Sequence, residues 1–127
     1  FSSEDHLAWV CSDENSRKDM LANPLNNFPL TVNMMHNLLE MMVQTHSRRG
    51  WKVLNPELPI TFLSGADDEA MGGEKKLHDA AMMMTNVGYN NVSAAIFSNM
   101  RHEILNEIDK EVVWNDILDF IMKIQTK

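Results

Sequence analysis

The sequence contains a single cysteine, Cys11, among its 127 residues. One cysteine cannot form a disulfide within the chain, and such low usage is typical of proteins from reducing compartments. No apolar run approaches the roughly 18 residues that a membrane-spanning helix needs, and no targeting signal is recognisable. We therefore expect a cytoplasmic protein without a transmembrane segment. Because no local signature surrounds Cys11, we expect it to be a free, half-buried structural residue rather than a nucleophile.

Basic residues are also scarce, with 11 Lys and Arg against 18 Asp and Glu, so that the net charge is −7. The basic residues are scattered apart from Arg48-Arg49 and Lys75-Lys76. A surface that binds nucleic acid must be basic to neutralise phosphates, and this composition therefore excludes a nucleic-acid partner.

The sequence gives no pattern for a metal site. His6, His36, His46 and His78 have no ligand spacing between them. His36 and His46 fall ten positions apart on one predicted helix, which is too far along it for both to bind one ion. We predict neither a metal nor another cofactor.

What is present is a hydrophobic fraction of 44%, which is ordinary for a globular domain with a modest core. Apolar residues at helical spacing and breakers at their ends predict four helices, whereas two short apolar runs bounded by turn residues predict buried strands. The predicted helices cover residues 16–22, 31–47, 74–86 and 109 onward, and the predicted strands cover 60–63 and 92–97.

The second half thus alternates strand, helix, strand, helix, which predicts an α/β fold built on a right-handed parallel βαβ unit. A sheet of two parallel strands leaves two open edges and an uncovered face. We therefore expect the sheet to be completed by strands from a missing N-terminal half or from a second copy of the chain.

Two polar clusters follow the two predicted strands, Ser64–Glu69 after the first and Asn99–Glu103 after the second. Functional residues of open parallel sheets lie at the carboxyl ends of strands. Since adjacent strands are about 4.8 Å apart, loops leaving their ends can place an acid beside a histidine. Such a pair is typical of acyl-transfer catalysis, although an Asp pair in a turn and a histidine in a loop can also be purely structural.

The stretch Leu58–Gly73 resembles the acid-bearing strand and loop of the serine aminopeptidase and monoacylglycerol lipase-like α/β-hydrolases, which are often described as lysophospholipases. In that family an apolar strand is followed by Gly, two residues and the catalytic Asp. Counting from Gly65 identifies Asp68 as the acid and Asp67 as its neighbour. Glu69 and Ala70 differ from the residues that usually follow the acid.

The segment Arg101–Glu107 resembles the histidine motif of the same family, and His102 matches the catalytic histidine. Asn99-Met100 stands where the family usually has Gly-Ala or Gly-Cys. Four upstream stretches are similar to the end of the family's helical cap: Ala8–Val10, Asp13-Glu14, Asn23–Leu25 and Phe28–Thr31. The resemblance therefore implies residues 1–50 as the end of a cap or lid and 51–127 as the C-terminal βαβα part of the hydrolase core.

The resemblance also implies a serine nucleophile in a Gly-x-Ser-x-Gly elbow upstream of the acid. None of the five glycines brackets a serine in this way. The chain is thus expected to be the acid- and histidine-bearing C-terminal portion of an ester hydrolase for lipid-like substrates, inactive alone. Its cap helix could line an acyl pocket with Met34, Met35, Leu38 and Met42.

Two other hypotheses stay open on the sequence. The first is a non-enzymatic interaction module derived from a hydrolase, which would self-associate through its exposed sheet edge. The second is a small flavodoxin-like ligand-binding unit, which the absence of a glycine-rich phosphate loop disfavours.

Overall fold

The computed structural model describes residues 6–26 and 28–125. Residues 1–5, at the start of the predicted cap segment, lie outside the described residues, as do 27, 126 and 127. The elements follow the order α1 (Glu14–Ala22), α2 (Val32–Ser47), β1 (Ile60–Gly65), α3 (Glu74–Val87), β2 (Val92–Phe97) and α4 (Lys110–Gln125). The predicted βαβα order is therefore confirmed, and β1 continues two residues beyond the predicted Leu63.

The helix starts follow from local capping. The carboxylate of Asp13 accepts the backbone N–H of Asn15 and opens α1 ahead of the predicted start. The hydroxyl of Thr31 accepts the N–H of Met34 and opens α2, as predicted. Both caps satisfy donors that the first turn of a helix leaves unpaired.

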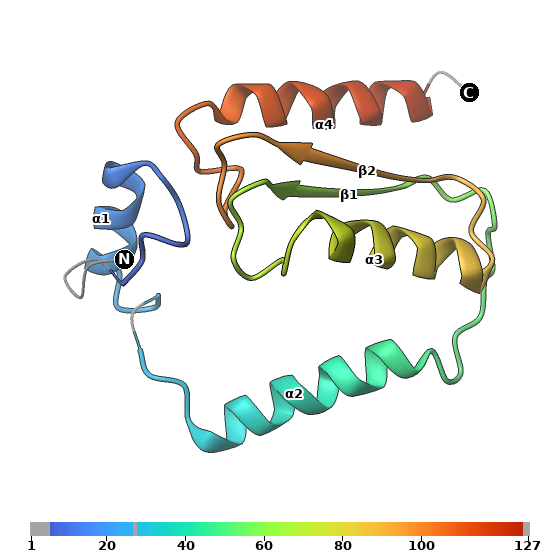
Figure 1. Cartoon of the computed structure of the whole chain (residues 1–127), viewed down its shortest axis with the longest axis horizontal. Coiled ribbons are helices and arrows are strands. Elements are labelled where there is room, and N and C mark those ends of the chain that lie inside the picture. Colours follow the sequence, from blue (N-terminus) through green and yellow to red (C-terminus); the bar gives the residue numbers. More distant parts are fainter. Residues whose placement is uncertain (1–5, 27, 126–127) are drawn as a thin grey trace.

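The strands β1 and β2 pair in parallel, with Ile60 opposite Val92 and Gly65 opposite Phe97. Helix α3 packs on both strands from one side, and α4 runs along the other side (Figure 1). Within the described part of the chain the sheet has two strands, so each strand has one outer edge without a partner strand. Because the strands are parallel, their carboxyl ends lie at the same end of the sheet, and so do the loops that follow them.

The buried core is small. Its hydrophobic members come from the N-terminal segment, α3, the loop after β2 and α4, namely Val10, Cys11, Leu77, Met100 and Val113. Ser64 and Glu107 are buried polar residues within it. The core therefore joins the N-terminal segment to the loop between β2 and α4, although these lie about 90 residues apart in the sequence.

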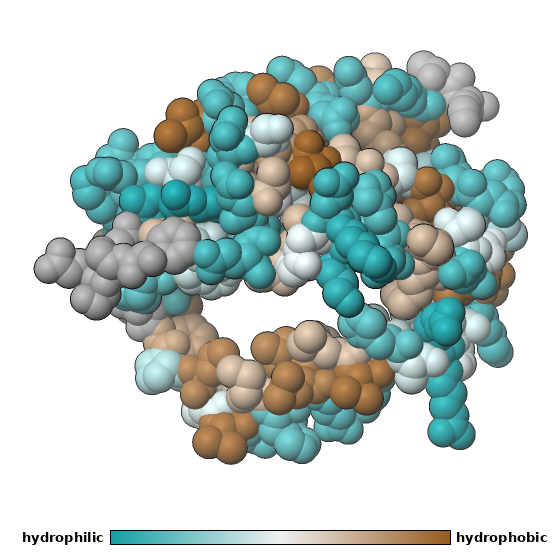
Figure 2. Space-filling view, in the orientation of Figure 1, coloured by the Kyte–Doolittle hydropathy of each residue, from teal (hydrophilic) through white to brown (hydrophobic). Residues whose placement is uncertain are grey.

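Helix α2 stands apart from this core. All of its residues are exposed, and its apolar side chains lie on the side facing an opening between α2 and the rest of the molecule (Figure 2). The exposed fraction of its large apolar residues ranges from 40% for Met34 to 89% for Val32. A helix with so much apolar surface in contact with solvent is typical of a segment that packs against another surface. No helix among the described residues has the length and apolarity required to cross a membrane.

Candidate active site

The end of β1 is fitted closely against the loop that follows β2. A Cβ atom at Gly65 would overlap the backbone carbonyls of Met100 and Arg101, so only glycine allows this approach. The chain then turns, and the N–H of Asp67 donates to the Met100 carbonyl at 2.9 Å, while that of Asp68 donates to the Gly65 carbonyl at 3.3 Å. Gly65 thus brings the acidic turn and the histidine loop together.

The carboxylate of Asp68 is fixed within this turn. Its Oδ1 accepts the N–H of Ala70 at 2.8 Å, and its Oδ2 accepts the hydroxyl of Ser64 at 3.4 Å. The Asp68 side chain is only 8% exposed. Asp67 is an exposed residue of the same turn. Burial and hydrogen bonds hold the Asp68 carboxylate in one orientation toward a partner. An exposed carboxylate such as that of Asp67 is not held in this way.

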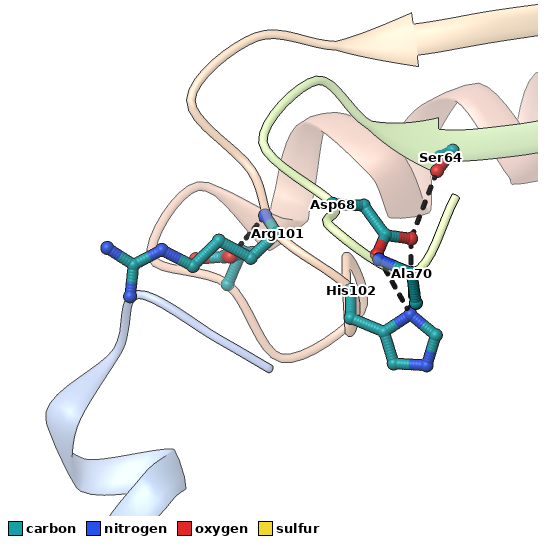
Figure 3. Close-up of polar contacts among 6 residues, drawn as sticks. Ser64, Asp68, Ala70, Arg101 and His102 are labelled. Carbon is teal, nitrogen blue, oxygen red and sulfur yellow. Dashed lines mark hydrogen bonds and ion pairs between the residues drawn. The ribbon is translucent and has the colours of Figure 1, made fainter. Parts of the chain in front are cut away.

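His102 lies opposite this carboxylate, in the loop after β2. Its Nδ1 is 3.2 Å from Asp68 Oδ1 and 3.1 Å from Oδ2, and Figure 3 shows the ring turned so that this nitrogen faces the acid. An Nδ1–H donated to the carboxylate leaves Nε2 as the ring nitrogen that can accept a proton. Since the His102 side chain is 45% exposed, a reactant can approach this nitrogen.

The turn that leads to His102 explains one departure from the family pattern. Asn99 has a positive φ of 59°, in the left-handed region. Glycine is the usual residue there, and asparagine is among the side chains that tolerate it best. Asn99 can therefore adopt the left-handed conformation at the position where the family usually has glycine.

Trp9 is a neighbour of the histidine that sequence reasoning did not connect with it. The Trp9 and His102 rings are 5.1 Å apart between centroids and inclined by 39°. They border an open hollow of about 320 Å³ with an apolar wall, lined by Leu7, Trp9, Val10, Met20, Asn26, His102 and Glu103. Trp9 belongs to the segment that resembles the family, but contact across more than 90 residues gives no local signal.

The four residues predicted to line an acyl pocket, Met34, Met35, Leu38 and Met42, lie on α2 and are 40–48% exposed. The structure does not bring them to the hollow beside His102. A separate shallow hollow on α2 includes Met35 among its lining residues. Their role in binding an acyl chain stays a prediction.

Cys11 is fully buried rather than half-buried. Its Sγ donates to the Asn106 carbonyl at 3.0 Å, and burial raises the pKa of the thiol above its ordinary value. A protonated, inaccessible thiol is a poor nucleophile, as expected for a structural cysteine. Among residues 6–26 and 28–125, no group of three or more metal-ligating side chains is close enough to hold an ion.

Comparison with known proteins decides the family. A family model described as serine aminopeptidase, S33, matches residues 1–109. The chain belongs to the S33 serine aminopeptidase family. No curated protein sequence matches the chain.

The fold of this S33 chain is similar to that of a soluble variant of monoglyceride lipase from Saccharomyces cerevisiae, solved in complex with a substrate analog. The TM-score is 0.73 at 18% sequence identity, over 97% of this chain. The chain spans 43% of the length of that lipase. The predicted α/β-hydrolase fold and the predicted family are therefore confirmed.

Proposed function

We propose that this chain provides the acid and the histidine of a Ser-His-Asp triad in an ester hydrolase. The observation that supports the proposal is the contact of His102 Nδ1 with both carboxylate oxygens of Asp68, at 3.1 and 3.2 Å, from loops that leave neighbouring parallel strands. This is the arrangement that acyl-transfer chemistry needs, because the acid holds the imidazole in one tautomer and stabilises its protonated form.

In this mechanism a serine attacks the ester carbonyl, and His102 Nε2 takes the hydroxyl proton. The same nitrogen then returns the proton to the leaving alcohol, and Asp68 stabilises the imidazolium between the two steps. A water molecule, deprotonated by His102 in the same way, then attacks the acyl-enzyme and releases the carboxylic acid product.

The nucleophile comes, in this proposal, from a Gly-x-Ser-x-Gly elbow in upstream sequence, because none of the glycines in these 127 residues brackets a serine. Strands of that upstream half would pair with the sheet edge of β1 or β2, and residues 1–50 would form the end of the cap over the core formed by 51–127. Without the elbow the chain alone is inactive. A second copy paired at the sheet edge is the alternative way to complete the sheet.

The proposed substrates are lipid-like esters, such as monoacylglycerols or lysophospholipids. Two observations support this class: the apolar wall of the hollow beside His102, and the exposed apolar side of α2 with Met34, Met35, Leu38 and Met42. The lipase with a similar fold was solved with a substrate analog. The cytoplasmic location predicted from the single cysteine belongs to the same proposal.

The experiment that tests the function is ester hydrolysis by the complete hydrolase that contains this chain. Replacing His102 with Ala should lower kcat for p-nitrophenyl butyrate by several orders of magnitude. His78→Ala is the matched control, because His78 is an exposed residue of α3 whose Nε2 forms an ion pair with Glu74 at 3.5 Å. Equal activity of His102→Ala and wild type would refute the triad.

Parallel assays with monoacylglycerol and with an aminopeptidase substrate distinguish ester from peptide hydrolysis. Turnover of the peptide alone would replace lipid esters as the substrate class but retain the triad. Absence of both activities in a protein with an intact serine elbow would favour the non-enzymatic interaction module.

A further inference from the structure

Glu107 is among the most deeply buried side chains that the structure describes, at 1% exposure. It lies in the loop between β2 and α4, five residues after His102. A carboxylate removed from water destabilises the fold unless several donors replace the lost hydration. The donors around Glu107 therefore indicate what the residue does.

Those donors come from two distant segments. The N–H of Ser12 lies 3.1 Å from Oε1 and 3.0 Å from Oε2, and the Ser12 hydroxyl donates to Oε2. The N–H of Arg101 donates to Oε1 at 2.7 Å. Arg101 directly precedes His102 and lies beside it in Figure 3. One carboxylate thus joins the N-terminal segment to the residue before the histidine.

Further bonds reinforce this junction. The guanidinium of Arg101 donates to the carbonyls of Ala8 and Cys11, the latter at 3.3 Å. The N–H of Glu103 donates to the Val10 carbonyl at 2.8 Å. The residues on both sides of His102 are therefore hydrogen-bonded to residues 8–12, and Trp9 in that segment contacts the His102 ring.

We propose that Glu107 is a positioning residue for His102. This inference rests on the proposed function. Asp68 orients the imidazole ring, whereas Glu107 fixes the backbone from which the ring projects, by holding the Arg101 N–H and the segment that carries Trp9. Displacement of a reacting group by about 1 Å can lower turnover on the order of 10²-fold, so the position of this backbone determines the rate.

The chemistry of these three donors predicts different outcomes for alanine and glutamine. Glu107→Ala removes every acceptor and should lower kcat on the order of 10²-fold, with KM within about twofold of wild type. In Glu107→Gln, Oε1 still accepts from Ser12 and Arg101, and the new amide can donate to the Ser12 hydroxyl, which also accepts. We expect the glutamine variant to retain kcat within a few-fold.

The test measures kcat, KM and the thermal unfolding midpoint of these variants in the complete hydrolase. Glu111→Ala is the control, because Glu111 is an exposed carboxylate in the first turn of α4. If Glu107→Ala does not fold, Glu107→Asp takes its place, since the shorter side chain cannot reach both Ser12 and Arg101. It should lower kcat at unchanged KM.

Loss of kcat in the folded variant together with rescue by glutamine supports the positioning role. A folded Glu107→Ala or Glu107→Asp variant with wild-type kcat would overturn it, as would a glutamine variant as slow as alanine. The proposed function fails separately: in that case His102→Ala is as active as wild type. Inactive His102→Ala with fully active Glu107→Ala refutes the positioning role alone.

Discussion

Replacing Asp68 with Asn tests the pairing of acid and histidine with the least change in shape. The asparagine Oδ1 can still accept the N–H of Ala70, so the turn after β1 should keep its path. The amide nitrogen, however, would donate toward His102 Nδ1 where the carboxylate now accepts. The ring proton would then move to Nε2, and the nitrogen that faces the reactants could no longer act as a base.

The size of the effect follows from which interaction is lost. A hydrogen bond to a charged group contributes about 1.5–3 kcal/mol, which would slow the reaction by about ten- to 150-fold. The wrong tautomer adds the loss of general base catalysis, typically about 10²–10⁴-fold. The Asp68 side chain is 8% exposed, so water cannot readily replace it. We therefore expect kcat to fall on the order of 10⁴-fold.

The assay is p-nitrophenyl butyrate hydrolysis by the complete hydrolase, with Asp67→Asn as the matched control. The control makes the same substitution on an exposed side chain one residue away. It leaves the hydrogen bond to the Met100 carbonyl in place, because that bond comes from the backbone N–H of Asp67. The control should retain activity within about twofold. Equal losses in the two variants, or a loss of less than tenfold in Asp68→Asn, would refute the reasoning.

Three further predictions concern the end of β1, the buried thiol of Cys11 and helix α2. Gly65→Ala should destabilise the fold by about 1–3 kcal/mol and lower kcat, because its Cβ would push the Met100 and Arg101 carbonyls away from β1; urea unfolding and kcat measure both. Cys11 should react with iodoacetamide at pH 8 at least about tenfold more slowly than a free thiol, because burial raises its pKa and so lowers the thiolate fraction; unfolding in guanidinium should restore the rate. Leu38→Asp should raise KM for long-chain p-nitrophenyl esters about tenfold or more and leave KM for the acetate ester unchanged. If the variant and wild type have equal KM values for long-chain esters, α2 does not line the acyl pocket.

Much of the fold was predictable from local patterns. The apolar spacing of α2 and the breakers around it predicted its extent, and the short apolar runs predicted β1 and β2. These signals are local because apolar side chains at a fixed spacing mark one face of a helix or strand. The end of β1 was missed by two residues, since Ser64 and Gly65 read as a turn. They stay in the strand because they pair with Ile96 and Phe97.

The site was predictable only where a motif marks it. Residue types at the strand ends suggested an acid near a histidine, but the choice of Asp68 over Asp67 came from counting after Gly65. The structure supplies the reason, because the turn after Gly65 directs Asp68 toward His102 and leaves Asp67 exposed. Glu107 lies within the histidine motif, yet nothing in its spacing reveals a partner such as Ser12, which lies 95 residues away.

The position of the nucleophile decides whether residues 1–127 can hydrolyse an ester alone. The measurement is p-nitrophenyl butyrate hydrolysis by residues 1–127 alone and after mixing with the proposed upstream half, which would carry the serine elbow. We expect no activity above the uncatalysed rate in the chain alone, and activity in the mixture that His102→Ala abolishes. Hydrolysis by residues 1–127 alone would contradict the account, because a serine of this chain or Cys11 would then be the nucleophile.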